Sequence, residues 1–253
     1  MNDLDGRVLI VTGGTRGIGR ATALAAVGRG ARVICCARDI MRGGAEVEAA
    51  AAAIGGSRCL ITAQADVSQE QDVVRLFNLA RSQFGQVDIA INNAGTSAAE
   101  LLVSHSLAEW DRVVATNVTG CLLVARELVR AARAARRPGV IVSIGSIAQE
   151  GTANNASYAA TKGALLGMTQ GLAREYGGDS IRANLVVAGY VDTELARGLN
   201  PRTRAFYLEY APARRAGTVD EIAGLALFLA SDRSRHVNGH ALLATGGLMQ
   251  CPA

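Results

Sequence analysis

A tyrosine and a lysine four residues apart are the first candidates for chemistry in this sequence. Lys162 is the only lysine of the chain, and Tyr158 precedes it by about one helical turn. The surrounding alanines and leucines favour a helix, on which positions i and i+4 share a face. An ammonium beside a phenol favours the phenolate, so this pair could donate a proton in general acid catalysis. Two solvated surface side chains could have the same spacing, so the rest of the sequence must decide between the two interpretations.

A glycine-rich segment lies between a β-branched run at residues 7–12 and a helix-forming run at residues 21–29. Its glycines include Gly13, Gly17 and Gly19. Glycines after a first strand let the backbone approach a phosphate closely, and the N–H groups of the following helix point at the anion. This context favours dinucleotide binding over an ordinary strand–helix loop.

The residues near the end of the second predicted strand, at positions 31–37, bear on the choice of cofactor. Arg38 follows this strand, and an acidic residue comes only at position 39. In dinucleotide folds an acidic residue binds the ribose 2′-hydroxyl of NAD, whereas an arginine accommodates the 2′-phosphate of NADP. Arg16, inside the glycine turn, could reach the same phosphate. Two guanidinium groups at one phosphate favour NADP(H), although both arginines could instead be solvated surface charges.

Strand and helix patterns alternate along the whole chain. Strands are predicted at residues 7–12, 31–37, 59–63, 87–91, 140–144, 181–187 and 241–244. This alternation predicts an α/β fold with a doubly wound, Rossmann-type parallel sheet of about seven strands, in a single domain over residues 1–253. The irregular segment 194–217 follows the sixth strand. Sites of such sheets lie at the carboxyl ends of the strands, so we expect this segment to cover the substrate as a lid.

Composition and charge exclude several classes of function. The net charge is only +4, aromatic residues make up 4%, and no basic block has interleaved aromatics, so we expect no nucleic-acid partner. No apolar run is long enough to span a membrane. The five cysteines lack metal-binding spacing and the three histidines are scattered, so no metal site is predicted. With an acidic start and no signal peptide, this composition indicates a cytoplasmic protein with reduced thiols.

Three motifs, in this order, resemble those of the short-chain dehydrogenase/reductase family. They are the Thr-Gly-x-x-x-Gly-Ile-Gly turn at residues 12–19, Asn-Asn-Ala-Gly at 92–95, and Tyr-x-x-x-Lys at 158–162. The resemblance covers essentially the whole chain and is greatest to the 3-oxoacyl-carrier-protein reductase branch. It implies an NADPH-dependent carbonyl reductase that transfers hydride to a ketone. The alternatives are an alcohol dehydrogenase working in the oxidative direction and a non-catalytic dinucleotide-binding regulator.

The resemblance also implies a role for each site residue. Tyr158 would be the general acid, Lys162 would hold the nicotinamide ribose and make Tyr158 a better proton donor, Ser146 would bind the carbonyl oxygen, and Asn117 would anchor a water. Ser143 is the other candidate serine, but it falls within a predicted strand. Asp66 and Val67 would contact adenine, Asn92 and Ala94 the adenosine side, and Val191 and Thr193 the carboxamide. The implied cofactor-binding set is Gly13, Thr15, Arg16, Gly17, Ile18, Gly19, Arg38, Asp66, Val67, Asn92, Ala94, Gly95, Tyr158, Lys162, Val191 and Thr193.

The partners implied are a small ketone or alcohol and further copies of the chain. In the reductase branch the substrate is carried by an acidic acyl carrier protein, for which Arg133, Arg136 and Arg137 could be docking residues. Asp179, however, falls where that branch tends to have a second basic residue. A secondary-metabolite ketone or a small free ketone therefore stays open. The family resemblance further implies a homotetramer formed through residues 107–135 and 155–176.

Overall fold

The computed structural model describes residues 3–55 and 58–248. Within these residues, seven parallel strands form one sheet in the order β3-β2-β1-β4-β5-β6-β7. The strands are β1 (Val8–Thr12), β2 (Arg32–Ala37), β3 (Leu60–Gln64), β4 (Ile89–Asn92), β5 (Gly139–Ser146), β6 (Ile181–Ala188) and β7 (Ala241–Ala244). The predicted doubly wound α/β fold is confirmed, and each predicted strand begins and ends within two residues of the observed one.

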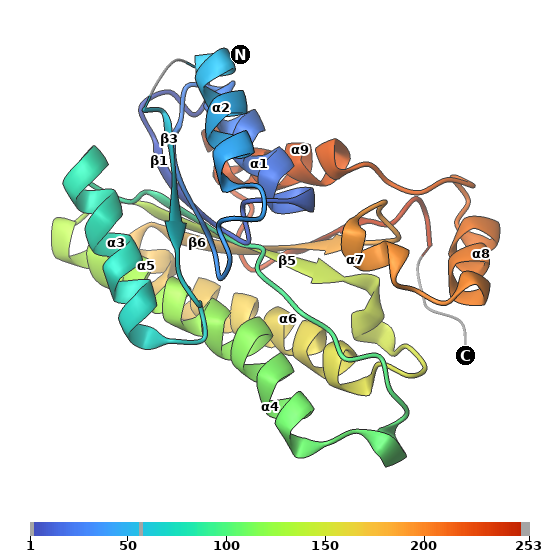
Figure 1. Cartoon of the computed structure of the whole chain (residues 1–253). Helices are drawn as coiled ribbons and strands as arrows, with labels where there is room; N and C mark the ends of the chain where they lie inside the picture. The colour runs from blue at the N-terminus through green and yellow to red at the C-terminus, as the bar shows by residue number, and fades with distance from the viewer. Residues whose placement is uncertain (1–2, 56–57, 249–253) are drawn as a thin grey trace.

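Helices cover both faces of the sheet, which makes the central strands fully buried (Figure 1). Leu9 and Val11 of β1 pack with α1, α2 and α9, whereas Ile10 faces α3 and α5 on the other side. This period of two follows from the pleat of the strand. The helices are α1 (Gly17–Val27), α2 (Gly44–Gly55), α3 (Glu70–Phe84), α4 (Leu107–Val114), α5 (Gly120–Ala135), α6 (Ala156–Tyr176), α7 (Glu194–Arg197), α8 (Pro201–Tyr210) and α9 (Val219–Ala230). No described helix has both the length and the apolar character needed to cross a membrane.

Helix α1 begins earlier than predicted, and the segment predicted to be irregular contains two helices, α7 and α8. Helix α1 begins at Gly17 rather than at residue 21, because the last residues of the glycine turn are already helical and the Arg20 N–H donates to the Arg16 carbonyl. The first turn of α1 is therefore part of the glycine turn itself. Helix α8 lies within the segment predicted to be irregular. The sequence feature that indicates α8 is its N-terminus, where the Asn200 side chain accepts a hydrogen bond from the Arg202 N–H and Pro201 occupies the first turn.

The order of the strands determines where a ligand can bind. Strands β1 and β4 are neighbours in the sheet, and the chain winds outward from this pair in opposite directions. Ligands of open α/β sheets bind outside the carboxyl ends of the strands at such a switch point. The glycine turn follows β1 and residues 93–95 follow β4, so both segments meet at this edge.

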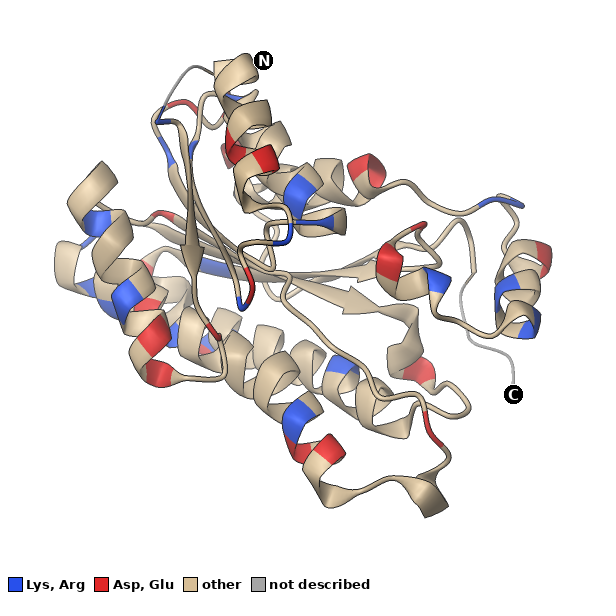
Figure 2. Cartoon of the chain, viewed as in Figure 1, with Lys and Arg blue, Asp and Glu red and all other residues tan. Residues whose placement is uncertain are grey.

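Charged residues are spread over the described surface with both signs interspersed (Figure 2). Many form ion pairs, such as Arg126 of α5 with Glu70 of α3, and Arg130 with Glu127 within α5.

Candidate active site

The glycine turn is shaped by backbone contacts that leave no room for side chains. Gly13 has a φ of +64°, a conformation that favours glycine. A Cβ atom at Gly19 would lie 2.2 Å from the Gly13 carbonyl oxygen and 2.4 Å from Asn93 Nδ2. The turn and the start of α1 are therefore packed directly on the segment after β4.

Residues 92–95 hold that turn in place through hydrogen bonds. Asn93 Nδ2 donates to the carbonyl oxygens of Thr12 (2.9 Å) and Gly13 (3.1 Å). In return, the Thr12 hydroxyl oxygen accepts from the backbone N–H groups of Asn93 and Ala94, both at 3.0 Å. Asn92, predicted to face the adenosine, has a buried side chain whose Nδ2 donates to the Cys121 carbonyl oxygen at 3.3 Å.

Lys162 and Asn117 converge on the glycine that ends this segment. A Cβ atom at Gly95 would lie 3.5 Å from Asn117 Oδ1 and 3.6 Å from Lys162 Nζ. Gly95 is exposed, whereas Lys162 is 5% exposed and Asn117 is fully buried. The Lys162 ammonium donates to the Ile144 carbonyl oxygen at 2.7 Å, which fixes it at the end of β5. An ammonium has three donors, so two remain for a ligand at this place.

Asn117 lies in a π-helical turn, η2 (Ala115–Thr119), between α4 and α5. Single π turns within helices are frequent at functional sites. The Asn117 Nδ2 donates to the Thr96 carbonyl oxygen (2.9 Å) and the Thr161 hydroxyl (3.0 Å), and its Oδ1 accepts from the Thr96 N–H (2.9 Å). The side chain thus ties the segment after β4 to α6 beside Lys162. The sequence showed Asn117 but gave no sign of Thr96 or Thr161 as its partners.

Tyr158 and Ser146 belong to adjoining elements. Tyr158 is half-buried in the first turn of α6, and its ring centroid lies 5.5 Å from Lys162 Nζ. Ser146 ends β5, and its oxygen accepts from the Ala148 N–H at 3.2 Å in the 3₁₀ turn η3 (Ile147–Glu150), against which α6 packs. Ser143 is buried within β5, as expected for a strand residue.

The arginines predicted to bind a 2′-phosphate lie at the surface near the glycine turn. Arg16 and Arg38 are both exposed, and Arg16 Nη1 pairs with Glu194 Oε2 at 2.6 Å. Arg42, which was not among the predicted site residues, pairs with Glu194 Oε1 at 2.9 Å. The Arg16 guanidinium hydrogen bond, followed by its charge and that of Arg42, lowers the pKa of the Glu194 carboxyl.

The remaining predicted cofactor residues lie at the same edge of the sheet, but several have buried side chains. Thr15, Val67 and Val191 are buried, and Ile18 is partly buried against the core. The Asp66 carboxylate accepts from the N–H and hydroxyl of Ser68. Thr193 caps α7, and its methyl carbon would lie 3.8 Å from a Cβ atom at Gly17. Thr193, predicted to hold the carboxamide, thus faces the glycine turn.

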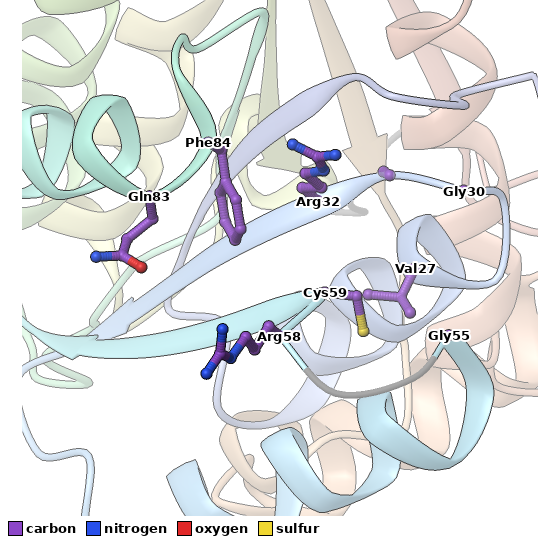
Figure 3. Close-up of a pocket in the computed structure, with 9 residues that line it drawn as sticks. Val27, Gly30, Arg32, Gly55, Arg58, Cys59, Gln83 and Phe84 are labelled. Carbon is purple, nitrogen blue, oxygen red and sulfur yellow. The ribbon is translucent and has the colours of Figure 1, made fainter.

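A cavity of about 460 Å³ lies near the amino ends of β2 and β3, away from the carboxyl ends that the predicted site residues follow (Figure 3). Arg32, Arg58, Gln83 and Phe84 are among its lining residues, and Arg32 begins β2 at its amino end. None of the predicted site residues lines it. Among residues 3–55 and 58–248, no group of three or more His, Cys, Asp or Glu side chains could hold a metal ion. The converging polar groups at the carboxyl ends of β1, β4 and β5 are therefore the candidate active site.

Known proteins resemble this chain over nearly its full length. A family model described as Enoyl-(Acyl carrier protein) reductase matches residues 13–249. The 3-oxoacyl-(acyl-carrier-protein) reductase FabG of Salmonella typhimurium is 35% identical over 96% of this chain and 98% of its own length. MabA of Mycobacterium tuberculosis, with the same reductase name, is 33% identical over 96% of this chain and 92% of its own length.

Two solved structures are also similar over nearly the full length. Levodione reductase superposes with a TM-score of 0.91 and 31% identity, covering 96% of this chain and 98% of that chain. A short-chain type dehydrogenase/reductase from Mycobacterium marinum superposes with a TM-score of 0.93 and 31% identity, covering 99% of this chain and 98% of that chain. The chain belongs to the short-chain dehydrogenase/reductase family, and it is an oxidoreductase acting on CH–OH and C=O groups.

Proposed function

We propose that this protein is an NADPH-dependent carbonyl reductase that reduces a ketone, with Tyr158 as the general acid. The observation that carries the proposal is that Lys162 Nζ and Asn117 Oδ1 both lie close to the exposed Gly95. Lys162 follows Tyr158 by about one turn of α6. Lys162 Nζ lies 5.5 Å from the Tyr158 ring centroid, and Gly95 follows β4 at the switch point of the sheet, where ligands of this fold bind, which supports the proposal.

The residues present fit a dinucleotide. The glycine turn packs so closely on itself that a Cβ atom at Gly19 would lie 2.2 Å from the Gly13 carbonyl oxygen, and α1 begins there without a side-chain cap or an acidic residue in its first turn, as a pyrophosphate site at a helix N-terminus requires. At the other end of the site, Lys162 retains two donors for a ribose. When bound, NADPH supplies the hydride.

The protein groups then have separate roles at the ketone. The Tyr158 hydroxyl gives its proton to the carbonyl oxygen, and the nearby Lys162 ammonium stabilises the phenolate that remains. The Ser146 oxygen already accepts a hydrogen bond from the Ala148 N–H, so its own proton is free to be donated to the same carbonyl oxygen. Asn117 positions the segment after β4 against α6 and would anchor a water beside Lys162.

The preference for NADPH over NADH rests on charge near the end of β2. Arg16 and Arg38 are exposed close to the position that a 2′-phosphate takes in this fold, and Arg42 adds a third guanidinium group. Comparing kcat/KM for NADPH and NADH checks this preference. The same comparison distinguishes a ketone reductase from the alternative, an alcohol dehydrogenase that works in the oxidative direction.

The substrate side of the site is apolar and aromatic. Ile147, the residue after Ser146, lies in one buried cluster with Tyr207 of α8, against which Tyr190 packs. The Tyr190 and Tyr207 rings are stacked with centroids 5.8 Å apart, and Phe206 stacks on Tyr210 at 4.3 Å. Segment 194–217 therefore fits the role of a lid over a ketone with apolar substituents.

Delivery by an acyl carrier protein is the less favoured form of the substrate. Arg133, the first candidate docking residue, pairs with Asp179 at 2.9 Å, and Arg137 pairs with Asp88 at 3.4 Å. An acidic partner would have to compete with these internal carboxylates. FabG and MabA are named as reductases of carrier-bound 3-oxoacyl substrates, so such a substrate should also be tested. A free ketone, a free 3-oxoacyl thioester and a carrier-bound 3-oxoacyl thioester should be assayed side by side.

The decisive test of the mechanism is Tyr158→Phe, assayed as ketone-dependent oxidation of NADPH. Loss of the proton donor should lower kcat by at least about 10²-fold, the usual contribution of general acid catalysis. Tyr176→Phe, at the far end of the same helix, is the matched control and should retain wild-type turnover. If Tyr158→Phe also turned over at the wild-type rate, the mechanism would be wrong.

A further inference from the structure

One carboxylate joins three segments that are far apart in the sequence. Glu194 is the first residue of α7, and each of its oxygens has its own arginine: Oε2 lies 2.6 Å from Arg16 and Oε1 lies 2.9 Å from Arg42. The three side chains are each about 60% exposed, so they meet at the rim of the site in contact with solvent. This contact links the start of segment 194–217 to the glycine turn.

The backbone brings these groups together. Gly43 has a φ of +93°, and a Cβ atom there would lie 2.7 Å from the Thr15 carbonyl oxygen. The segment after β2 is thus packed on the glycine turn, which puts Arg42 beside Arg16. Thr193 faces Gly17 from the other side, so Glu194 follows directly at the same turn.

A carboxylate and a phosphate make the same demand on an arginine. The planar guanidinium group binds either anion through paired N–H donors, and two arginines around one anion bind it more strongly than one. Arg16 is also a residue that the proposed function assigns to the 2′-phosphate of NADPH. In the structure the Arg16 guanidinium group is already paired with an anion of the protein, the Glu194 carboxylate.

We propose that Glu194 is an internal competitor of the cofactor's 2′-phosphate: it holds Arg16 and Arg42 until that phosphate replaces it, and the exchange releases α7. Glu194 thereby sets the strength of the preference for a phosphorylated cofactor and couples cofactor binding to segment 194–217. The inference rests on the proposed NADPH preference, but it concerns binding alone. NADH, which lacks the phosphate, leaves the Glu194 contacts intact.

Removing the competing charge tests the proposal by direct binding. Isothermal titration of the full chain uses adenosine 2′,5′-bisphosphate and 5′-AMP, which differ only in the 2′-phosphate. Because exposed ion pairs are individually weak, Glu194→Gln should tighten the bisphosphate by about three- to twenty-fold. Its affinity for 5′-AMP should change by less than about two-fold, since that ligand does not need the arginines.

Asp192→Asn is the matched control. Asp192 lies two residues away, pairs with Arg197 at 3.2 Å, and its substitution removes the same charge. It should leave both affinities within about two-fold, because its carboxylate does not hold either arginine. An equal gain in Asp192→Asn, a gain for 5′-AMP as large as for the bisphosphate, or no gain in Glu194→Gln would overturn the proposal.

Hydrogen exchange of the backbone amides supplies the second readout. In the wild type, the bisphosphate should speed exchange over residues 194–197, and 5′-AMP should not. In Glu194→Gln that exchange should be fast without any ligand. No ketone is present in either experiment, so absence of turnover would count against the proposed function and leave this inference standing. Unchanged exchange with both ligands would contradict the release of α7.

Discussion

The glycines of the turn after β1 have no side chain, and this lets the candidate active site form. A Cβ atom at Gly19 would meet the backbone carbonyl of Gly13 at 2.2 Å, and neither that carbonyl nor Asn93 is free to move, because Asn93 Nδ2 is hydrogen-bonded to it. We expect Gly19→Ala to lower the free energy of unfolding and to weaken nucleotide binding by more than about ten-fold, since the start of α1 must shift away from the phosphate site. Urea unfolding and nucleotide titration measure the two effects.

The control for this substitution is Gly224→Ala in α9, where a Cβ atom would have nothing within 4 Å. Alanine is preferred over glycine in a helix by about 1 kcal/mol, so this variant should be as stable as the wild type or more stable. Equal nucleotide affinity in Gly19→Ala and Gly224→Ala would show that the packing of the turn does not control binding.

The cysteines illustrate how burial suppresses reactivity. Burial raises the pKa of the Cys36 thiol to about 12 and that of Cys121 to about 11, and it raises the pKa of Cys35 further. Only a thiolate attacks a disulfide reagent, so these thiols should stay neutral and unmodified at pH 8. Cys251 lies outside the described residues and is removed by Cys251→Ser for this test.

In that background, 5,5′-dithiobis(2-nitrobenzoate) should label at most the half-buried Cys59 in the native state, and all four remaining cysteines in guanidinium chloride. Rapid native labelling of two or more thiols would contradict the burial of Cys35, Cys36 and Cys121.

At the scale of elements, the start of α9 connects surface electrostatics to the site. The Thr218 side chain accepts from the Glu221 N–H, the Glu221 carboxylate accepts from the Thr218 N–H, and Arg215 pairs with the same carboxylate. The Arg215 hydrogen bond, followed by that of Thr218, lowers the pKa of Glu221 to about 2. Helix α9 packs on α1, whose first turn belongs to the glycine turn, so fraying here would reach the cofactor site.

The lowered pKa predicts how the stability depends on pH. A carboxyl whose pKa is lower in the folded state stabilises that state above its unfolded pKa of about 4.3, and the contribution is lost as the pH falls through about 2. Glu221→Gln should therefore be less stable than the wild type by a constant amount between pH 5 and 8. The difference should shrink between about pH 4.3 and about pH 2. Urea unfolding at each pH tests this, and a difference that stays constant down to pH 2 would exclude the ion pair as its cause.

How far the sequence determines these elements depends on the range of the interactions. Six of the seven strands contain β-branched residues within short apolar runs, which is a local pattern, whereas β7 (Ala241–Ala244) is a short apolar run without them. Helix α8 lacks a clear apolar stripe, so only its cap indicated it. The Glu194 contacts could not be predicted: Arg16 and Arg42 lie 178 and 152 residues away in the sequence. Pairings of that range exist only once the sheet has brought β1, β2 and β6 together.

At the scale of the whole molecule, apolar side chains remain on the outer face of α4 and α5. Leu107 of α4 is 80% exposed and Leu122 of α5 is 48% exposed. The neighbouring α5 residues Leu123, Val124 and Leu128 are instead buried in the core. Large exposed apolar residues on one face are typical of sites where proteins associate. They lie within residues 107–135, the range through which the family resemblance implies a homotetramer.

We therefore expect the protein to form a tetramer that depends on this face. Leu122→Glu places a charge where an apolar contact would be buried, which is costly without a partner charge, so its mass by light scattering should fall to that of a dimer or a monomer. Ile54→Glu on α2, at a residue that is 54% exposed, introduces the same charge outside this face and should leave the assembly intact. Circular dichroism confirms that both variants are folded. A tetramer that persists in Leu122→Glu, or that is lost equally in Ile54→Glu, would show that α5 does not form the contact, and the exposed leucines would then need another partner.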